Sequence, residues 1–346
     1  MRQALAALLA VALLASGCDR GGRPPPSGGE AVPELVWPAP PATPRIRFLR
    51  AVAGPADLGI RPSLWERVGA ALAGRDSEAF VRPAGVAARD GVLYVADPGV
   101  PALWILDSRT GRARRIAEAA GHPLVSPVAL ALGPDGQVFL ADSALARIFR
   151  IDGAGRTTAT LADARLRRPA GLAYDPARDR LYVADSASHR VLVLAGDGRP
   201  VGEIGRRGAA PGEFNFPTHL AVAPDGGLVV TDALGYRVQR FAPDGTPAGH
   251  FGRHGNAAGD FASPKGVALD SEGHVYVVEP LFDAVQIFDP AGRFLLGFGE
   301  RGGGRGQFWL PGSVFIDPQD RIYVGDAYNG RVQVFEYLRG GGNGAS

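Results

Sequence analysis

Residues 326–335 read DAYNGRVQVF, and partial copies of this stretch recur along the chain. In each copy an acidic residue ends a short apolar run, and a second apolar run follows after a turn. The acidic residues are Asp97, Asp142, Asp185, Asp232, Glu279 and Asp326. Each stands 14 to 16 residues after a proline, and these prolines are Pro83, Pro127, Pro169, Pro217, Pro264 and Pro311. A repeat of about 42 to 48 residues therefore organises the chain.

Each repeat predicts four short antiparallel strands. In the third repeat, residues 171–185 read GLAYDPARDRLYVAD, which is two alternating apolar runs around a polar turn. Residues 189–198 (HRVLVLAGDG) and 199–205 (RPVGEIG) supply the third and fourth strands. Turn chemistry of the Pro-Asp-Gly type separates the strands elsewhere. Four-stranded sheets that repeat in this way bury both faces by stacking radially, so we expect an all-β propeller.

The unit resembles the NHL repeat, in which an acidic residue is followed by x-x-N-x-R-V-Q-x-F at the turn between the second and third strands. Residues 326–335 match this pattern fully. The resemblance implies a six-bladed β-propeller of four-stranded antiparallel blades over residues 45–338. Because an acid and an arginine five residues later recur in four of the six repeats, we expect these pairs to shape the turn rather than perform chemistry. These pairs are Asp142 with Arg147, Asp185 with Arg190, Asp232 with Arg237 and Asp326 with Arg331.

The sixth repeat stops after three strands, at Leu338. Residues 44–52 (PRIRFLRAV) form an additional apolar strand near the start of the chain and resemble the fourth strand of a blade. We therefore expect this N-terminal strand to complete the last blade and close the ring. Residues 55–80 do not fit the repeat, and within them residues 62–74 predict a short amphipathic helix.

The first residues resemble a bacterial lipoprotein signal. Arg2 precedes an apolar stretch over 4–14, and small residues lead to Cys18, the only cysteine of the chain. The resemblance implies a signal peptide over 1–17 and acylation of Cys18, hence an exported protein anchored to the inner or outer membrane or the cell surface. The alternative is an ordinary secretory signal with an incidental Cys18. Residues 18–44 predict a Pro/Gly-rich tether, although Val36 and Trp37 can instead dock on the folded part, and residues 339–346 predict a flexible tail.

Charge gives a local rather than a global argument, because the formal net charge is only +2. Strand direction alternates in a meander, so the loops that lead into the six prolines and the turns after the six acids share one face, which we call the proline face. The candidate binding arginines on it are Arg167, Arg168, Arg206, Arg207, Arg253, Arg301 and Arg305. The opposite, aspartate face carries most of the turn aspartates. A basic face suits an anionic partner, whereas the alternative is that turns favour Asp and that Arg supplies solubility.

A second candidate site lies at the mouth of the central channel. The residues that differ from their counterparts in other repeats are Thr218, His219, Lys265, Glu279 and Phe282. Lys265 is the only lysine of the chain. Polar groups that converge on a concave mouth indicate a ligand site, and the alternative is a satisfied structural cluster. The histidines show no ligand spacing and the inner strands are apolar, so we expect no metal, no cofactor and no catalytic residue.

These observations favour a monomeric propeller that binds or scaffolds a protein partner in the cell envelope over an enzyme. Two alternatives stay open: a hydrolase or lyase at the channel mouth, and binding of an anionic glycan or other polyanion by the basic face. Nucleic acid is not an expected partner of an exported protein.

Overall fold

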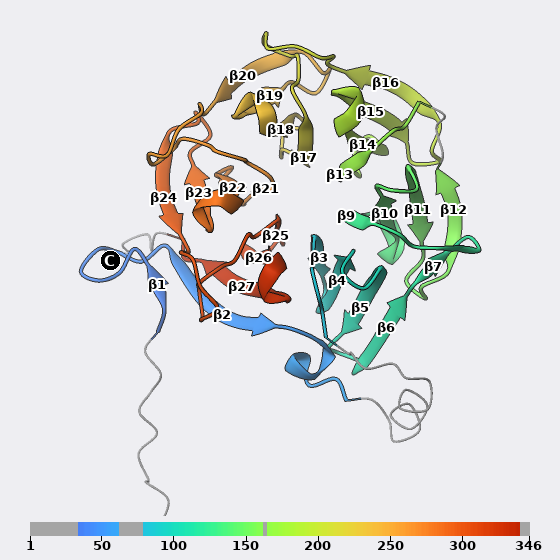
Figure 1. Ribbon diagram of the computed structural model, residues 1–346, viewed down its shortest axis with the longest axis horizontal. Helices are drawn as coiled ribbons and strands as arrows, with labels where there is room; N and C mark the ends of the chain where they lie inside the picture. Colours follow the sequence, from blue (N-terminus) through green and yellow to red (C-terminus); the bar gives the residue numbers. More distant parts are fainter. Residues whose placement is uncertain (1–33, 62–78, 162–164, 340–346) are drawn as a thin grey trace, which may run out of the picture. The chain divides into compact units, whose positions relative to one another are not determined.

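The computed structural model describes residues 34–61, 79–161 and 165–339. The predicted signal peptide, Cys18, the helix expected over 62–74 and residues 340–346 lie outside this part of the chain. Within it, the chain forms six four-stranded blades around a central axis, and every pair of neighbouring strands in a blade is antiparallel (Figure 1). The all-β, six-bladed propeller predicted from the repeats is confirmed.

The blades follow the sequence order, and the innermost strand of each comes first. Blades one to three consist of β3 (Gly85–Arg89), β4 (Val92–Asp97), β5 (Ala102–Asp107) and β6 (Arg112–Ile116); β9 (Pro127–Leu132), β10 (Val138–Asp142), β11 (Arg147–Ile151) and β12 (Thr157–Leu161); and β13 (Pro169–Asp175), β14 (Arg180–Asp185), β15 (Arg190–Ala195) and β16 (Pro200–Ile204). A small hairpin, β7 (Glu118–Ala119) with β8 (His122–Pro123), links blades one and two.

Blades four to six repeat the same order. Their strands are β17 (Pro217–Val222), β18 (Leu228–Asp232), β19 (Arg237–Phe241) and β20 (Pro247–Phe251); β21 (Val267–Leu269), β22 (Val275–Glu279), β23 (Ala284–Phe288) and β24 (Phe294–Phe298); and β25 (Ser313–Ile316), β26 (Arg321–Asp326) and β27 (Arg331–Tyr337) with β2 (Ile46–Val52). Short 3-10 turns follow the acidic residue in blades three to six: η3 (Ser186–Ser188), η4 (Ala233–Gly235), η5 (Pro280–Phe282) and η6 (Ala327–Asn329). Two more are η1 (Pro55–Leu58) and η2 (Pro134–Gly136).

The N-terminal strand closes the ring, in agreement with the prediction. β2 pairs antiparallel with β27, and Phe48 lies opposite Phe335 in this register. A further strand, β1 (Val36–Trp37), then pairs with β2. Trp37 packs its ring 5.8 Å from the ring centres of both Phe298 and Phe335. Val36 and Trp37 therefore dock on the folded part, which is the alternative that the sequence left open for the end of the tether.

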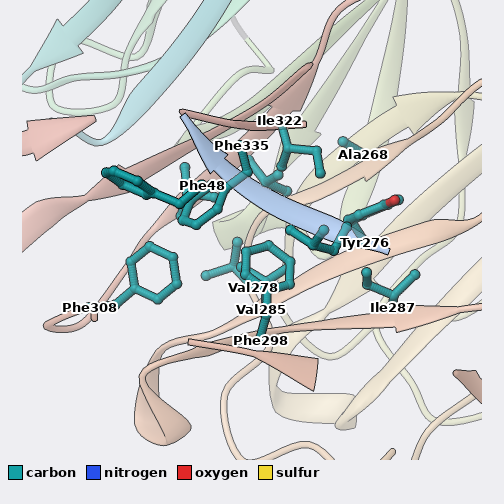
Figure 2. Packing of buried hydrophobic residues seen from close by; sticks show 13 residues of the cluster. Phe48, Ala268, Tyr276, Val278, Val285, Ile287, Phe298, Phe308, Ile322 and Phe335 are labelled. Carbon is teal, nitrogen blue, oxygen red and sulfur yellow. The ribbon is translucent and has the colours of Figure 1, made fainter. Parts of the chain in front are cut away.

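The core consists of apolar clusters between neighbouring blades. In the cluster between blades five and six, Phe48 of β2 packs with Phe335, Phe298 and Phe308 (Figure 2). A phenylalanine stands three residues before the proline in four repeats, and all four are buried: Phe80, Phe214, Phe261 and Phe308. Burial of one such ring stabilises the fold by about 1.5–3 kcal/mol. These rings therefore occupy a recurring core position.

Glycines make room for three of these rings. The backbone at Gly205, Gly252 and Gly299 has φ values of +80°, +91° and +93°. A Cβ atom at these positions would lie 2.3–2.4 Å from ring carbons of Phe214, Phe261 and Phe308 respectively. Both the left-handed backbone and the close approach require glycine at the end of the fourth strand.

Candidate functional site

The six recurring acids are structural. All six side chains are completely buried. Asp142 accepts backbone hydrogen bonds from Val125 and Ser126, which precede its blade, and from Ala144 and Leu145 of its own turn. Each carboxylate thus joins the loop that leads into a blade to the second turn of that blade. Such fully occupied acceptors are not free for chemistry.

Glu279 performs the same task in blade five despite its longer side chain. Its carboxylate accepts N–H groups from Ala262, Ser263 and Leu281 at 2.9–3.2 Å. Burial raises the pKa of Glu279, and these N–H groups together with the charge of Lys265 oppose the rise. Glu279 is therefore a turn acid like its counterparts.

Two of the four expected acid–arginine pairs are ion pairs in the structure. Arg237 Nε lies 3.1 Å from Asp232, and Arg331 Nε lies 2.8 Å from Asp326. Arg190 instead pairs with Glu203 at 2.7 Å, and within the described residues no ion pair joins it to Asp185. Arg147 likewise makes no ion pair with Asp142 in the described part of the chain, because the Asp142 carboxylate is already occupied by backbone N–H groups.

The candidate arginines of the proline face fall into three groups. Arg206 and Arg253 form ion pairs with Glu213 and Asp260 at 2.8–2.9 Å. Two others lie over aromatic rings: Arg168 is 5.8 Å from the ring centre of Phe216, and Arg305 is 5.0 Å from that of Phe48. The remaining three candidates, Arg167, Arg207 and Arg301, form no ion pair, side-chain hydrogen bond or ring contact with the described residues. The positive charge of this face is therefore smaller than its arginine count indicates.

The aspartates of the opposite face mainly shape turns. Asp152, for example, accepts the N–H groups of Ala154 and Arg156 and forms an ion pair with the Arg156 guanidinium. Asp289 and Arg293 repeat this arrangement in blade five. This pattern supports the alternative that turns favour Asp, because local backbone N–H groups and neighbouring arginines satisfy these carboxylates.

The channel-mouth candidates come together in part. Thr231 links them, since its hydroxyl accepts the N–H of His219 and lies 2.7 Å from the Lys265 carbonyl oxygen and 3.5 Å from the Thr218 hydroxyl. Lys265 reaches solvent, yet surrounding protein lowers the pKa of its ammonium. Phe282 ends the turn η5, half-buried.

His219 faces the central channel, a cavity of about 260 Å³ lined by the innermost strands. Burial, followed by the charge of Lys265, lowers the pKa of His219 to about 3, so its ring is neutral at physiological pH. Two buried polar atoms in the channel wall have no hydrogen-bond partner among the described residues, His219 Nδ1 and Ser313 Oγ. The rest of the wall is mainly apolar, as the strand sequences predict.

Two negative observations apply to the described residues alone. These residues contain no group of three or more His, Cys, Asp or Glu side chains with the geometry to hold a metal ion. The same part of the chain has no helix of sufficient length and hydropathy for a membrane span.

An exposed apolar surface on the proline face was not anticipated from the sequence. It consists of Leu281, Trp309, Tyr328 and Val81, which are between 44% and 61% exposed, and we call it the apolar arc. The rings of Trp309 and Tyr328 pack against each other, tilted by 39°, with their centres 5.7 Å apart. Each of the four residues has a fixed position in the repeat, either two residues after the recurring acid or two residues before the proline. Only the fold shows that these positions lie close together.

Contacts between neighbouring turns make the arc continuous. The Asp283 carboxylate in the turn that carries Leu281 accepts the N–H of Leu310, next to Trp309. The turn that carries Tyr328 ends at Gly330, which lies against the backbone of Phe80 and Val81. A Cβ atom at Gly330 would be 2.9 Å from the Phe80 carbonyl oxygen and 3.6 Å from that of Val81. The arc therefore runs over blades five, six and one.

Comparisons with known proteins agree with the repeat and the fold. The Teneurin NHL domain family matches residues 109–196, and the NHL repeat family matches residues 308–335. Teneurin-m of Drosophila melanogaster is 36% identical over 75 residues, which is 22% of this chain and only 3% of that protein.

Solved structures with a similar fold have little sequence identity to this chain. A streptogramin B lyase has a TM-score of 0.57 at 13% identity and covers 75% of this chain and 94% of its own. Virginiamycin B lyase from Staphylococcus aureus has a TM-score of 0.55 at 14% identity, with 75% and 96% covered. A chain of the nidogen/laminin complex has a TM-score of 0.54 at 21% identity, with 68% and 85% covered. At these identities the likeness establishes the fold alone.

Proposed function

We propose that this six-bladed β-propeller, which carries NHL-type repeats, is a protein-binding module whose partner docks on the proline face. The apolar arc carries this proposal. Ten large apolar side chains are exposed in the described part of the chain: Leu49, Val81, Val125, Val201, Leu234, Leu281, Phe294, Leu295, Trp309 and Tyr328. Six of them lie in proline-face loops, four lie on outermost strands, and none lies in an aspartate-face turn of the described residues.

The one-sided distribution is the informative feature. Single exposed apolar residues are normal on any protein, whereas a group of neighbouring exposed apolar residues is typical of an interaction surface. Aromatic residues are enriched in the centres of protein interfaces, and charged residues surround them. Trp309 and Tyr328 supply such a centre.

Exposed positive charges next to the arc indicate the charge of the proposed partner. Arg82 is next to Val81 and Arg301 precedes Trp309 in its loop, both are exposed, and neither has an ion-pair partner among the described residues. We therefore assign the arc to a protein segment with an apolar centre and acidic side chains at its rim. The charge complementarity chiefly increases the association rate and the specificity.

We further propose that the module is exported and held at the cell envelope by a lipid on Cys18. This part rests on the lipobox-like sequence that ends at Cys18 and on a tether that leads into β1 and β2. Cys18→Ser should move the protein from the membrane fraction to the soluble fraction. Unchanged membrane association would contradict the lipid anchor without affecting the docking proposal.

Photo-crosslinking tests the docking surface. A photoreactive residue at Tyr328 should crosslink a defined partner in envelope preparations, and the same residue at Leu295, exposed on an outermost strand, should not. With the purified partner, Trp309→Ser should weaken binding by at least about tenfold, as expected for a central aromatic side chain, and Leu295→Ser should leave it unchanged. Equal crosslinking at both positions, or equal affinity of both variants, would refute the proposal.

A lyase or hydrolase at the channel is the second candidate. The observation that favours it is the pair of unpartnered buried atoms, His219 Nδ1 and Ser313 Oγ, in the wall of the channel. Two lyases share this fold, although fold likeness does not carry activity across. Incubation with quinupristin, with and without a chelator, followed by mass spectrometry of the products tests this candidate, and His219→Leu is its control. Product formation that the variant lacks would support it, and an unaltered substrate would count against this chemistry.

A further inference from the structure

Three proline-face loops share one backbone arrangement. They lead into blades four, five and six, and corresponding residues are 47 positions apart, as with Phe214, Phe261 and Phe308. In each loop, the phenylalanine N–H donates to the carbonyl eight residues earlier at 2.8 Å, and the phenylalanine carbonyl accepts a glycine N–H at 2.9–3.2 Å. The three loops therefore present their carbonyl groups in the same way.

A glutamine of the third strand holds each loop in place. In blade four, Gln239 accepts the N–H of Gly212 at 3.0 Å and donates to the Glu213 carbonyl at 2.7 Å. Gln286 makes the same two contacts in blade five, and Gln333 makes them in blade six. Blade five has both glutamine contacts, so its loop is held in the same way as the other two.

A guanidinium group fills the centre of two of these loops. Arg237 donates to the carbonyls of Ala209, Ala210 and Glu213 at 2.8–3.3 Å and to Asp232 at 3.1 Å. Arg331 donates in the same way to the carbonyls of Gly303, Gly304 and Gln307 at 2.7–2.8 Å, and to Asp326. Only 10% and 14% of the two arginine side chains is exposed, so each guanidinium lies inside its loop.

Blade five has the acceptors without the cation. Ala284 stands where Arg237 and Arg331 stand, and it is partly exposed to solvent. The corresponding carbonyls belong to Asn256, Ala257 and Asp260. Among the described residues, the Asn256 carbonyl accepts no hydrogen bond, and those of Ala257 and Asp260 each accept one, from Asp260 N–H and Gln286 respectively.

We propose that the blade-five loop is a receptor for the guanidinium group of an arginine side chain that the protein partner supplies. This inference rests on the proposed docking function, because Leu281 of the apolar arc belongs to the turn beside Ala284. Arginine fits better than lysine, since the acceptors are spread over a loop that holds a planar, forked donor in two sister blades. The buried Glu279 carboxylate supplies negative charge, and Phe282, where blade four has Gly235, supplies an aromatic side chain near the site.

A small cation tests the receptor without the partner. Ethylguanidinium should shift the amide NMR signals of Asn256, Ala257 and Gly259 with a Kd on the order of millimolar, as expected for a ligand of few heavy atoms. Propylammonium at the same concentration should cause much smaller shifts. Ala284→Arg, which fills the receptor from within, should abolish the response, and Arg237→Ala should create an equivalent response in blade four. The absence of a saturable response in blade five would overturn the inference.

Stability provides an independent measurement. If the acceptors form a guanidinium site, Ala284→Arg should raise Tm by about 2–4 °C, whereas Ala284→Met, which adds length without donors, should not. A lower or unchanged Tm for Ala284→Arg would also count against the receptor.

Measurements of partner affinity test the guanidinium receptor separately from the docking surface. Ala284→Arg should weaken partner binding at least about tenfold, because its guanidinium fills the receptor and repels the arginine of the partner, and Ala284→Met serves as the control for size. If Trp309→Ser abolishes binding while Ala284→Arg leaves it intact, the receptor is wrong and the docking surface stands. If neither variant affects binding, the docking surface itself is wrong.

Discussion

Replacement of Arg331 tests how the proline-face loops are held. Arg331 makes four hydrogen bonds, one to the buried Asp326 carboxylate and three to the carbonyls of Gly303, Gly304 and Gln307. Hydrogen bonds to charged groups contribute about 1.5–3 kcal/mol each. Four of them at the lower value sum to about 6 kcal/mol, and about 2 kcal/mol of side-chain entropy opposes them.

Water reduces the loss of stability in the Arg331→Ala variant further. Gly303 and Gly304 are exposed, so water can satisfy their carbonyls after the arginine is removed, whereas Asp326 remains buried. We therefore expect Arg331→Ala to lower the free energy of unfolding by about 3 kcal/mol, in the range for a broken buried ion pair. Arg331→Lys should recover less than half of the loss, because an ammonium group cannot reach carbonyls on both sides of the loop.

Urea unfolding at constant m-value measures this change, and Arg147→Ala is the matched control. Arg147 occupies the same repeat position in blade two, but its side chain has no ion pair or hydrogen bond among the described residues. Its replacement should therefore cost less than about 0.5 kcal/mol. Equal losses for Arg331→Ala and Arg147→Ala would refute the reasoning, because the contacts in blade six would then contribute nothing.

Three other predictions concern the channel, the glycine positions and the ring closure. The pKa of His219 in the folded protein lies below its unfolded value of about 6.5, so the stability that depends on a neutral His219 is complete above about pH 6.5 and is lost as the pH falls toward about 3. NMR titration should show a neutral ring at about pH 5. A titration midpoint near about 6.5 would contradict burial in the channel. Gly252→Ala should cost about 2–4 kcal/mol in thermal or urea unfolding, since φ is +91° and the new Cβ would lie 2.3 Å from Phe261; a loss below about 0.5 kcal/mol would mean that the loop adapts freely. Ile46→Ala should cost about 2–5 kcal/mol because Ile46 is fully buried in β2, and an unchanged unfolding midpoint would show that β2 does not close the ring.

The strands and the ring closure could be predicted because their signals are local and repeated. Alternating apolar residues define each strand, and the acid, the proline and the phenylalanine recur at constant positions. The missing fourth strand of the sixth repeat pointed to residues 44–52, where β2 lies. The docking of Trp37 could only be left open, since a two-residue strand in a proline-rich segment carries no periodic signal.

The candidate sites were harder to predict because side-chain partners depend on distances between repeats. Arg147 and Arg190 occupy the same motif position as Arg237 and Arg331, yet the first has no ion pair in the described residues and the second pairs with Glu203. The sequence predicts a basic surface on the proline face, but Glu213 and Asp260 neutralise two of its arginines.

The sequence by itself determined the repeat, the number of blades and the structural role of the recurring acids, because all three follow from a local pattern that recurs along the chain. Only the tertiary structure decided which surface is exposed for binding. Val81 and Trp309 are separated by more than half of the chain, and ring closure brings their loops into one continuous apolar arc. The tertiary structure also shows why the absence of an arginine at Ala284 matters. In blade six, three carbonyls converge on the guanidinium of Arg331, and the corresponding loop of blade five has no such group to bind among the described residues.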